Sequence, residues 1–139
     1  MINAGTDDGV RIDDIVVCSE GLAGRISDAG RDWAKVTGIV DPSVSVSFCV
    51  LRDPSVIGVA KGDGAGGITG YLFDDSDFIL ESDVLVTSGL GFYPQGIRIA
   101  QVDTVHISEN TKKKEITAFT EVDFRSVRMV TVLTKDLQR

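Results

Sequence analysis

The run Val44-Ser45-Val46-Ser47-Phe48-Cys49-Val50-Leu51 alternates large apolar residues with serine or cysteine. Its first, third, fifth and seventh residues fall on one face of an extended chain, and the small residues between them fall on the other. This period of two residues is typical of a strand that is buried on one face. The run therefore predicts a half-buried β-strand, and similar runs lie on both sides of it.

The composition agrees with a sheet protein. The 139 residues include 18 Val and 12 Ile but only 8 Leu and 8 Ala, and β-branched side chains pack well on a pleated surface. No segment keeps an apolar pattern of helical period over the ~10 residues that a stable helix needs. We therefore expect an all-β fold with no long helix, with turns every 8 to 12 residues between strands at 15–18, 22–27, 33–40, 44–51, 56–60, 68–73, 84–87, 97–107, 115–120 and 127–134.

Two strand-and-turn segments resemble each other. Residues 14–22 (DIVVCSEGL) match residues 83–90 (DVLVTSGL) with one deletion, and the return strands at 24–26 and 96–99 are also similar. A duplication of this kind predicts two small related β-barrels of five to six strands each. Counting strands assigns residues 1–41 and 109–139 to a first barrel. One strand of this barrel can lie upstream of these residues. The second barrel then spans residues 42–108 and can be an insertion in the first.

The charge and the residue counts exclude several classes of function. With a net charge of -7 and only a short basic run at 112–114, which is typical of a hairpin tip, the chain is a poor nucleic-acid binder. The chain has a single histidine, His106, and zinc sites usually need several histidine or cysteine ligands. We therefore expect no metal and no cofactor. Cys18 and Cys49 fit either two buried free thiols or one disulfide. No window reaches the ~20 apolar residues of a membrane span.

Three motifs resemble catalytic or ligand-binding sites but lack other features that such sites require. Residues 62–67 (GDGAGG) satisfy a dinucleotide-binding pattern, yet a strand rather than a helix follows them, which favours a glycine-rich hairpin loop. The acidic turn at 74–77 lacks the glycine and glutamate of a calcium loop. Ser88 and His106 invite comparison with a trypsin-like hydrolase, but Val86 replaces the first glycine of the usual nucleophile turn. We expect no catalytic residue.

The loop at 89–96 (GLGFYPQG) is the most unusual surface candidate. Three glycines and a proline make a stiff turn that can present Phe92, Tyr93 and Pro94 to a partner. Adjacent residues of an extended chain point in opposite directions, so one of the two rings can instead plug the end of a barrel. A module that binds cell-wall glycan through the two rings is a further alternative.

Motifs along nearly the whole chain resemble the rod shape-determining protein family MreC. The residues that carry this resemblance lie in order at 3–10, 21–26, 41–43, 83–91, 93–97, 122–124 and 127–133. The segment 83–91 resembles the most specific motif of the family. The chain departs from the family pattern at 81–83, where it has Glu-Ser-Asp, and it has one residue fewer before Pro94.

The resemblance implies a non-enzymatic scaffold of the cell-wall elongation machinery. Expected partners are a class B penicillin-binding protein, MreD, the MreB filament system and a RodA-type polymerase, together with self-association into homodimers or filaments. The implied location is extracytoplasmic. The resemblance also implies a membrane helix and a coiled coil that precede the domain and lie outside these residues. Structural roles in the turns are implied for Gly21, Leu22, Gly24, Ser88, Gly89, Leu90 and Gly91.

Overall fold

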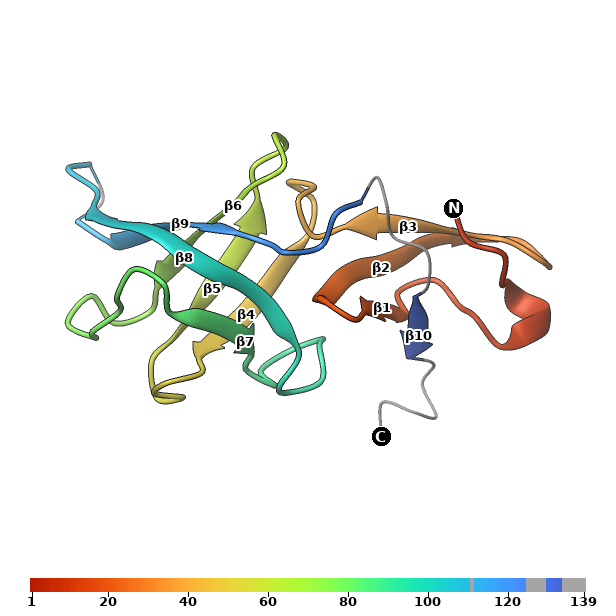
Figure 1. The fold of residues 1–139 in the computed structure, drawn as a ribbon, viewed down its shortest axis with the longest axis horizontal. Coiled ribbons are helices and arrows are strands. Elements are labelled where there is room, and N and C mark those ends of the chain that lie inside the picture. Colours follow the sequence, from red (N-terminus) through yellow and green to blue (C-terminus); the bar gives the residue numbers. More distant parts are fainter. Residues whose placement is uncertain (111, 125–129, 134–139) are drawn as a thin grey trace. The chain divides into compact units, whose positions relative to one another are not determined.

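The computed structural model describes residues 1–110, 112–124 and 130–133, which form ten strands in two separate sheets (Figure 1). The strands are β1 (Ile15–Cys18), β2 (Gly21–Ala29), β3 (Ala34–Gly38), β4 (Ser45–Val50), β5 (Ile57–Gly62), β6 (Ile68–Leu72), β7 (Val84–Thr87), β8 (Arg98–Ile107), β9 (Lys114–Phe119) and β10 (Thr131–Leu133). Each overlaps a predicted run, and the predicted all-β class is confirmed. The only helix of the described part is a single 3-10 turn, η1 (Thr6–Asp8). Of the last predicted run, residues 127–129 and 134 lie outside the described residues.

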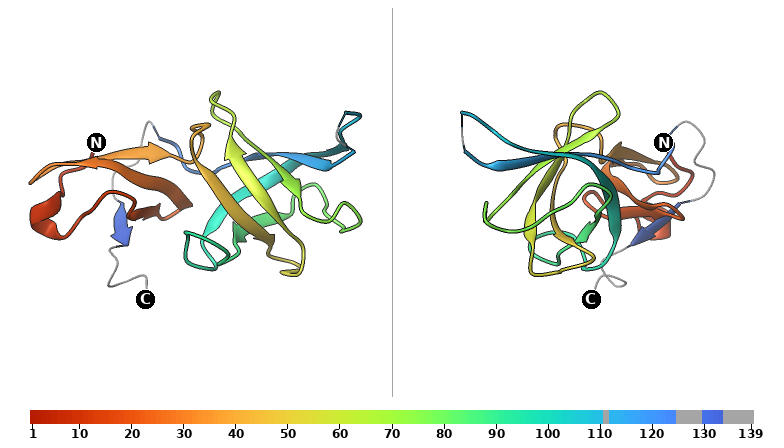
Figure 2. Two further views of the ribbon diagram at one scale, coloured as in Figure 1. Left: turned by 180° about the vertical axis from the view of Figure 1, so that it is seen from behind. Right: turned by 60° about the vertical axis from the view of Figure 1, so that its left-hand side comes forward.

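Residues Val40–Glu121 form a compact unit built around a closed barrel. Its strands follow one another in the order β4-β5-β6-β9-β8-β7, and β7 pairs with β4 to complete the ring (Figure 2). The alternating residues of β4 behave as the sequence predicts, because Val46, Phe48 and Val50 are buried. The side chains of Ile68 and Leu85 are likewise at most 2% exposed. This unit therefore has its own hydrophobic core.

Residues Met1–Ile39 and Val122–Arg139 form the second compact unit. Its described part is a four-stranded antiparallel sheet in the order β10-β1-β2-β3. A separate core lies under this sheet, formed by Val10, Val16, Ala23, Ile26, Ala34 and Val122. Of the two barrels predicted from the sequence, one is thus closed, and the described strands of the other unit make an open sheet.

The structure differs from the sequence prediction at residues 109–121. These residues were expected in the first unit, but β9 pairs with β6 and β8 inside the closed barrel. The reason is local, because a short turn joins β8 to β9 and antiparallel strands joined in this way are neighbours. Counting strands along the chain does not show which strands pair, so it placed β9 in the wrong unit and separated it from β8.

The two segments that look alike in sequence begin with the same local structure. Asp14 and Asp83 directly precede β1 and β7, and they are only 2% and 8% exposed. Each carboxylate accepts a hydrogen bond from the backbone N–H three residues earlier, at 2.9 Å from Arg11 and at 2.8 Å from Leu80. Buried carboxylates need such donors, so both aspartates fix the entry of the chain into a strand.

The barrel core supplies a test of this packing. Phe48 is fully buried in β4, and we expect Phe48→Ala to lower the free energy of unfolding by about 3–5 kcal/mol. Phe119 in β9 is 45% exposed, so Phe119→Ala should cost less than about 1 kcal/mol. Urea denaturation of both variants measures the difference, and equal losses would contradict the assignment of Phe48 to the core.

Candidate partner-binding surface

The loop between β7 and β8 is closed at its base by one buried hydroxyl. Thr87 is fully buried, and its Oγ1 donates a hydrogen bond to the carbonyl of Pro94 and accepts one from the N–H of Ile97 at 2.8 Å. The backbone of Thr87 also exchanges hydrogen bonds with Ile97 and Gly96. A single side chain therefore joins the two ends of the loop and fixes where its tip projects.

The two aromatic rings of this loop have opposite environments. Tyr93 is 6% exposed and Phe92 is 51% exposed, and their rings meet edge to face with centroids 5.6 Å apart. Tyr93 is thus the ring that packs into the protein interior, and Phe92 is the ring that faces solvent. Leu90 is also exposed, at 55%. Of the predicted residues, Phe92 is exposed, Pro94 is half-buried and Tyr93 is buried, and the loop also exposes Leu90.

The glycines of this loop are required by its backbone. Gly89 has φ +82° and Gly91 has φ +86°, conformations that side chains other than glycine rarely adopt. Gly24 in β2 serves a different purpose, because a Cβ there would lie 2.0 Å from the carbonyl oxygen of Thr37 in β3. Gly21 begins β2 with φ +132°, and the next residue, Leu22, is fully buried.

Ser88 is placed for structure and does not meet the histidine. Its hydroxyl lies 2.8 Å from that of Ser47 in β4, and it accepts a hydrogen bond from the N–H of Leu90 at 3.1 Å. His106 faces Glu115 across the β8–β9 pair, with 3.4 Å between Nε2 and Oε2. The start of β8 lies beside the end of β7, and His106 is eight residues further along, roughly 26 Å at 3.3 Å per residue. Ser88 and His106 therefore cannot form a nucleophile and base pair.

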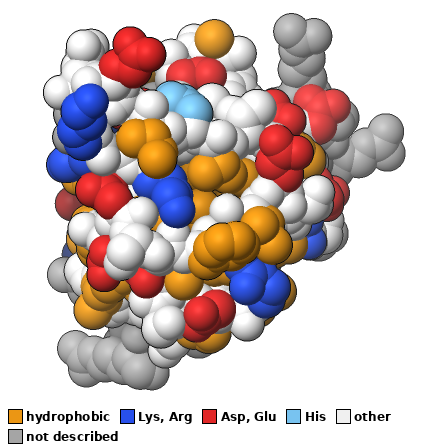
Figure 3. All heavy atoms as spheres, turned by 90° about the vertical axis from the view of Figure 1, so that its left-hand side faces the viewer, with side chains coloured by type: hydrophobic (Ala, Val, Ile, Leu, Met, Phe, Trp, Pro, Cys, Tyr) orange, Lys and Arg blue, Asp and Glu red, His pale blue; other side chains and the backbone are white. Residues whose placement is uncertain are grey.

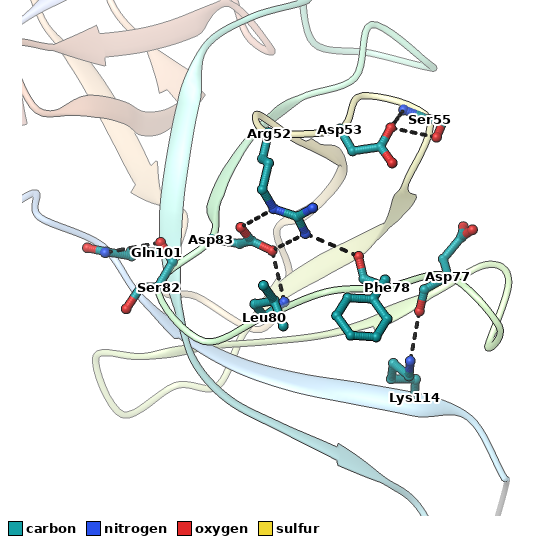
Figure 4. Close-up of polar contacts among 10 residues, drawn as sticks. All are labelled: Arg52, Asp53, Ser55, Asp77, Phe78, Leu80, Ser82, Asp83, Gln101 and Lys114. Atoms are coloured by element: carbon teal, nitrogen blue, oxygen red, sulfur yellow. Dashed lines mark hydrogen bonds and ion pairs between the residues drawn. The ribbon is translucent and has the colours of Figure 1, made fainter.

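A second loop, residues 73–83 between β6 and β7, is held by an ion pair that the sequence did not reveal (Figure 4). Arg52 donates through Nε and Nη2 to the two carboxylate oxygens of Asp83, at 3.0 and 2.9 Å. Arg52 also reaches the carbonyl of Phe78 at 3.4 Å. These contacts hold the pKa of the Asp83 carboxyl below its usual value, chiefly through the hydrogen bonds from Arg52.

Lys114 in the β8–β9 hairpin forms hydrogen bonds with the same β6–β7 loop. The backbone N–H of Lys114 donates to the carboxylate of Asp75 at 2.9 Å, and its Nζ donates to the carbonyl of Asp77 at 2.7 Å. Lys113 lies over the ring of Tyr71, with its Nζ 4.4 Å from the ring centroid. The basic run at 112–114 is therefore part of a hairpin turn, as its sequence predicted, and two of its lysines also make structural contacts.

The β6–β7 loop, like the β7–β8 loop, leaves apolar side chains in solvent. Phe73, Phe78 and Leu80 are 52%, 68% and 45% exposed. Figure 3 looks toward the end of the barrel that carries the single histidine, and hydrophobic side chains lie across this face among acidic and basic ones. Exposed apolar side chains held on a fixed backbone are typical of binding surfaces. Sequence reasoning missed these residues, although two phenylalanines beside an acidic turn are a signal that could have shown them.

The remaining candidates have structural roles. Gly62 ends β5, and residues 63–67 form the hairpin loop to β6, where Asp63 accepts hydrogen bonds from the N–H groups of Ala65 and Gly67. Asp74 in the acidic turn accepts from both the N–H and the hydroxyl of Ser76. Cys18 and Cys49 are free thiols, and burial raises the pKa of each.

The fold and this surface define an all-β protein in which a closed six-stranded barrel presents apolar loops on ordered backbone. The chain belongs to the MreC family, because the model of the rod shape-determining protein MreC, barrel core, matches residues 1–134. This match confirms the resemblance seen in the sequence motifs.

Individual relatives agree with this assignment. The chain is 29% identical over 103 residues to the cell shape-determining protein MreC of Cereibacter sphaeroides and 33% identical over 110 residues to that of Haemophilus influenzae. These alignments cover 73% and 76% of the chain but only 34% and 30% of the relatives, so the chain spans about a third of their length. The crystal structure of MreC from Pseudomonas aeruginosa matches with a TM-score of 0.84 and 28% identity, over 94% of this chain and 85% of that one.

The Thr87 clamp predicts a specific loss of stability. In Thr87→Val the partly buried N–H of Ile97 and the carbonyl of Pro94 lose their shared partner, and we expect the free energy of unfolding to fall by about 1–3 kcal/mol. Thr104→Val removes an exposed hydroxyl bonded to Thr117 and should cost no more than about 0.5 kcal/mol. Equal midpoints for the two variants in urea would argue against the clamp.

The Arg52–Asp83 pair predicts a response to acid. Because the folded state lowers the pKa of Asp83 below its ordinary 3.8, the pair stabilises the loop above that pH and loses this contribution as the pH falls through the lowered pKa. The amide of Leu80 donates to Asp83, so its exchange protection should drop in acid below about pH 3.8.

Asp83→Asn provides the comparison. This variant should show weak protection at Leu80 already at neutral pH, whereas Asp63→Asn, which alters hydrogen bonds to Ala65 and Gly67 in the β5–β6 loop, should behave as the unmodified chain. Protection factors from exchange measured by NMR between pH 2 and 7 give the result. A flat profile in the unmodified chain would show that Asp83 does not hold the loop.

Proposed function

We propose that this chain is a non-enzymatic scaffold module of the bacterial cell-wall elongation machinery, and that its β7–β8 loop binds a class B penicillin-binding protein. The observation that carries the proposal is the pair of exposed side chains, Leu90 and Phe92, on a loop fixed by Thr87 and Tyr93. A loop that is ordered before binding loses little conformational entropy in a complex. Aromatic side chains are also enriched at the centre of protein interfaces.

The chemistry of this loop favours an apolar protein partner. Residues 88–97 contain no charged side chain in a chain whose net charge is -7. A partner that docks here therefore buries no unpaired charge of the loop, which removes the largest cost of desolvation. A glycan surface would instead call for polar groups around the exposed ring, and the second ring proposed for it, Tyr93, is buried.

The scaffold proposal extends to the other partners of the machinery. We propose that MreD, the MreB filament system and a RodA-type polymerase share the assembly, and that the protein self-associates as a homodimer or filament. The proposed location is extracytoplasmic, with a membrane anchor outside these residues. Within the described part of the chain, no helix is long and apolar enough to cross a bilayer. Membership of a cell shape-determining family and the separation of Ser88 from His106 support a scaffold rather than a hydrolase.

Binding measurements test the proposed contact. The extracytoplasmic domain of the class B penicillin-binding protein from the same organism is immobilised, and binding of the chain is followed by biolayer interferometry. Loss of two exposed anchors should weaken binding at least about tenfold in the double variant Leu90→Ala, Phe92→Ala. Phe119→Ala removes a ring of similar exposure from β9 and should change binding less than about twofold.

Two outcomes would count against the proposal. Absence of binding by the unmodified chain would contradict the choice of partner. Unchanged binding by the double variant, with circular dichroism and urea midpoints equal to those of the unmodified chain, would show that the partner docks elsewhere. The exposed Phe78 on the β6–β7 loop would then be the next position to replace.

A further inference from the structure

The β6–β7 loop presents two apolar side chains to solvent on either side of a buried one. Ile79 is only 5% exposed, whereas its neighbours Phe78 and Leu80 are 68% and 45% exposed. Side chains alternate in direction along an extended chain, so Phe78 and Leu80 lie together on the side opposite to Ile79. Figure 4 shows both residues beside the ion pair of Arg52 and Asp83. The buried residue holds the segment to the barrel, and the exposed pair faces outward.

Ile107 at the end of β8 extends this apolar surface. Its side chain is 63% exposed and lies opposite Lys114, and residues directly opposite each other in antiparallel strands share one face of the sheet. Lys114 reaches the loop, because its Nζ lies 2.7 Å from the carbonyl oxygen of Asp77, the residue directly before Phe78. We call Phe78, Leu80 and Ile107 the barrel-end surface. Hydrophobic side chains gather on this end of the barrel in Figure 3.

The backbone that carries this surface is held in place on both sides of Ile79. The carbonyl oxygen of Phe78 accepts a hydrogen bond from Arg52 at 3.4 Å. The N–H of Leu80 donates to the carboxylate of Asp83 at 2.8 Å, and that carboxylate is itself paired with Arg52. A surface that is ordered before binding loses little conformational entropy in a complex. The exposed pair is therefore suited to binding a partner.

The loop that carries this surface is acidic. Residues 73–83 contain four aspartates and one glutamate but no lysine or arginine. Together with Arg52 and Lys114, the cations that contact it from the described part of the chain, the loop has a net charge of -3. Among the described residues, Asp83 is the one of these five carboxylates that has an ion-pair partner. The other four carboxylates remain available to cations of a partner.

The barrel-end surface and the β7–β8 loop differ in position and in charge. Residues 73–83 precede the start of β7, whereas residues 88–97 follow its end, so the two loops lie at opposite ends of this strand (Figure 1). Residues 88–97 carry no charged side chain. Electrostatic complementarity favours a partner of opposite charge at an acidic surface and gives no such preference at an uncharged one. The barrel therefore offers two surfaces that suit different partners.

The acidic charge also decides which occupant suits the barrel-end surface. A second copy of this chain has a net charge of -7 and would bring acidic residues against an acidic loop. An anionic lipid surface attracts basic segments and repels carboxylates. A protein segment with apolar residues on one side and lysine or arginine on the other complements both the exposed apolar side chains and the carboxylates beside them. Of these occupants, the basic amphipathic segment fits best.

We propose that the barrel-end surface is a second docking site, and that its occupant is a basic amphipathic segment of a partner protein. Apolar side chains of the segment cover Phe78, Leu80 and Ile107, and its lysines or arginines pair with Asp77 and Glu81. This site does not depend on the contact proposed for the β7–β8 loop, because it lies at the other end of β7. A barrel with a site at each end of this strand is able to hold two proteins at once.

Binding of a defined peptide tests the apolar part of this site. The probe is a fluorescent helical peptide with leucines on one face and lysines on the other, and fluorescence anisotropy follows its binding to the 139-residue chain at ~0.15 M salt. The double variant Phe78→Ser, Leu80→Ser should bind at least about fivefold more weakly, because two exposed anchors are lost. Phe119→Ser replaces a ring on β9 that is 45% exposed and should change binding less than about twofold.

A second pair of variants tests the acidic part of the site. Asp77 contacts Lys114 through its backbone carbonyl, so the double variant Asp77→Asn, Glu81→Gln removes two charges and keeps this contact. It should bind the peptide at least about threefold more weakly. The matched control, Asp28→Asn with Asp32→Asn, removes the same charge from the other unit of the chain and should change binding less than about twofold, because salt screens distant charges.

Other results would overturn the proposal. Equal binding of a peptide with the same lysines in scrambled order, which has no apolar face, would show attraction by charge alone. Unchanged binding by both loop variants would place the peptide elsewhere. Dimerisation in analytical ultracentrifugation, or sedimentation with vesicles of phosphatidylethanolamine and phosphatidylglycerol, would identify a second copy or a membrane as the occupant if the serine variant abolishes it. If the serine variant does not fold, the charge variant decides: weaker binding supports the site, and unchanged binding overturns it.

Discussion

The pairing of β4 with β7 is the contact on which the barrel and its loops depend. These strands are far apart in the sequence, and their pairing closes the ring that would otherwise end in two open edges. Side chains fasten both ends of the pair, with Ser47 meeting Ser88 at one end and Arg52 meeting Asp83 at the other. Both apolar loops leave the barrel at β7, so closing the barrel also fixes the loops that a partner can reach.

The local parts of this structure were predictable from the sequence, and the long-range parts were not. Alternation along Val44–Val50 identified a strand because burial on one face depends only on neighbouring residues. The position of β9 and the Arg52–Asp83 pair depend on which strands meet, and no local pattern reports this. For the candidate surface, composition identified the loop, but only the structure separated the exposed Phe92 from the buried Tyr93.

The two copies of the strand motif differ most where the candidate surface lies. Two residues join β1 to β2, whereas ten residues join β7 to β8. Both copies keep the buried aspartate and the bulge after the second strand residue. The longer connection in the second copy adds the exposed Leu90 and Phe92 without changing the strands that support it. A conserved framework with one lengthened loop is a common way for a fold to acquire a binding surface.

The two units differ in when they can be completed during synthesis. The barrel is one continuous segment, Val40–Glu121, whereas the open sheet needs β10 from the end of the chain. A chain that emerges from its amino terminus at ~5–20 residues per second presents all six barrel strands before β10 appears. The barrel is therefore able to fold while the first sheet still lacks its last strand. Early termination before Thr131 would leave a complete barrel attached to an incomplete sheet.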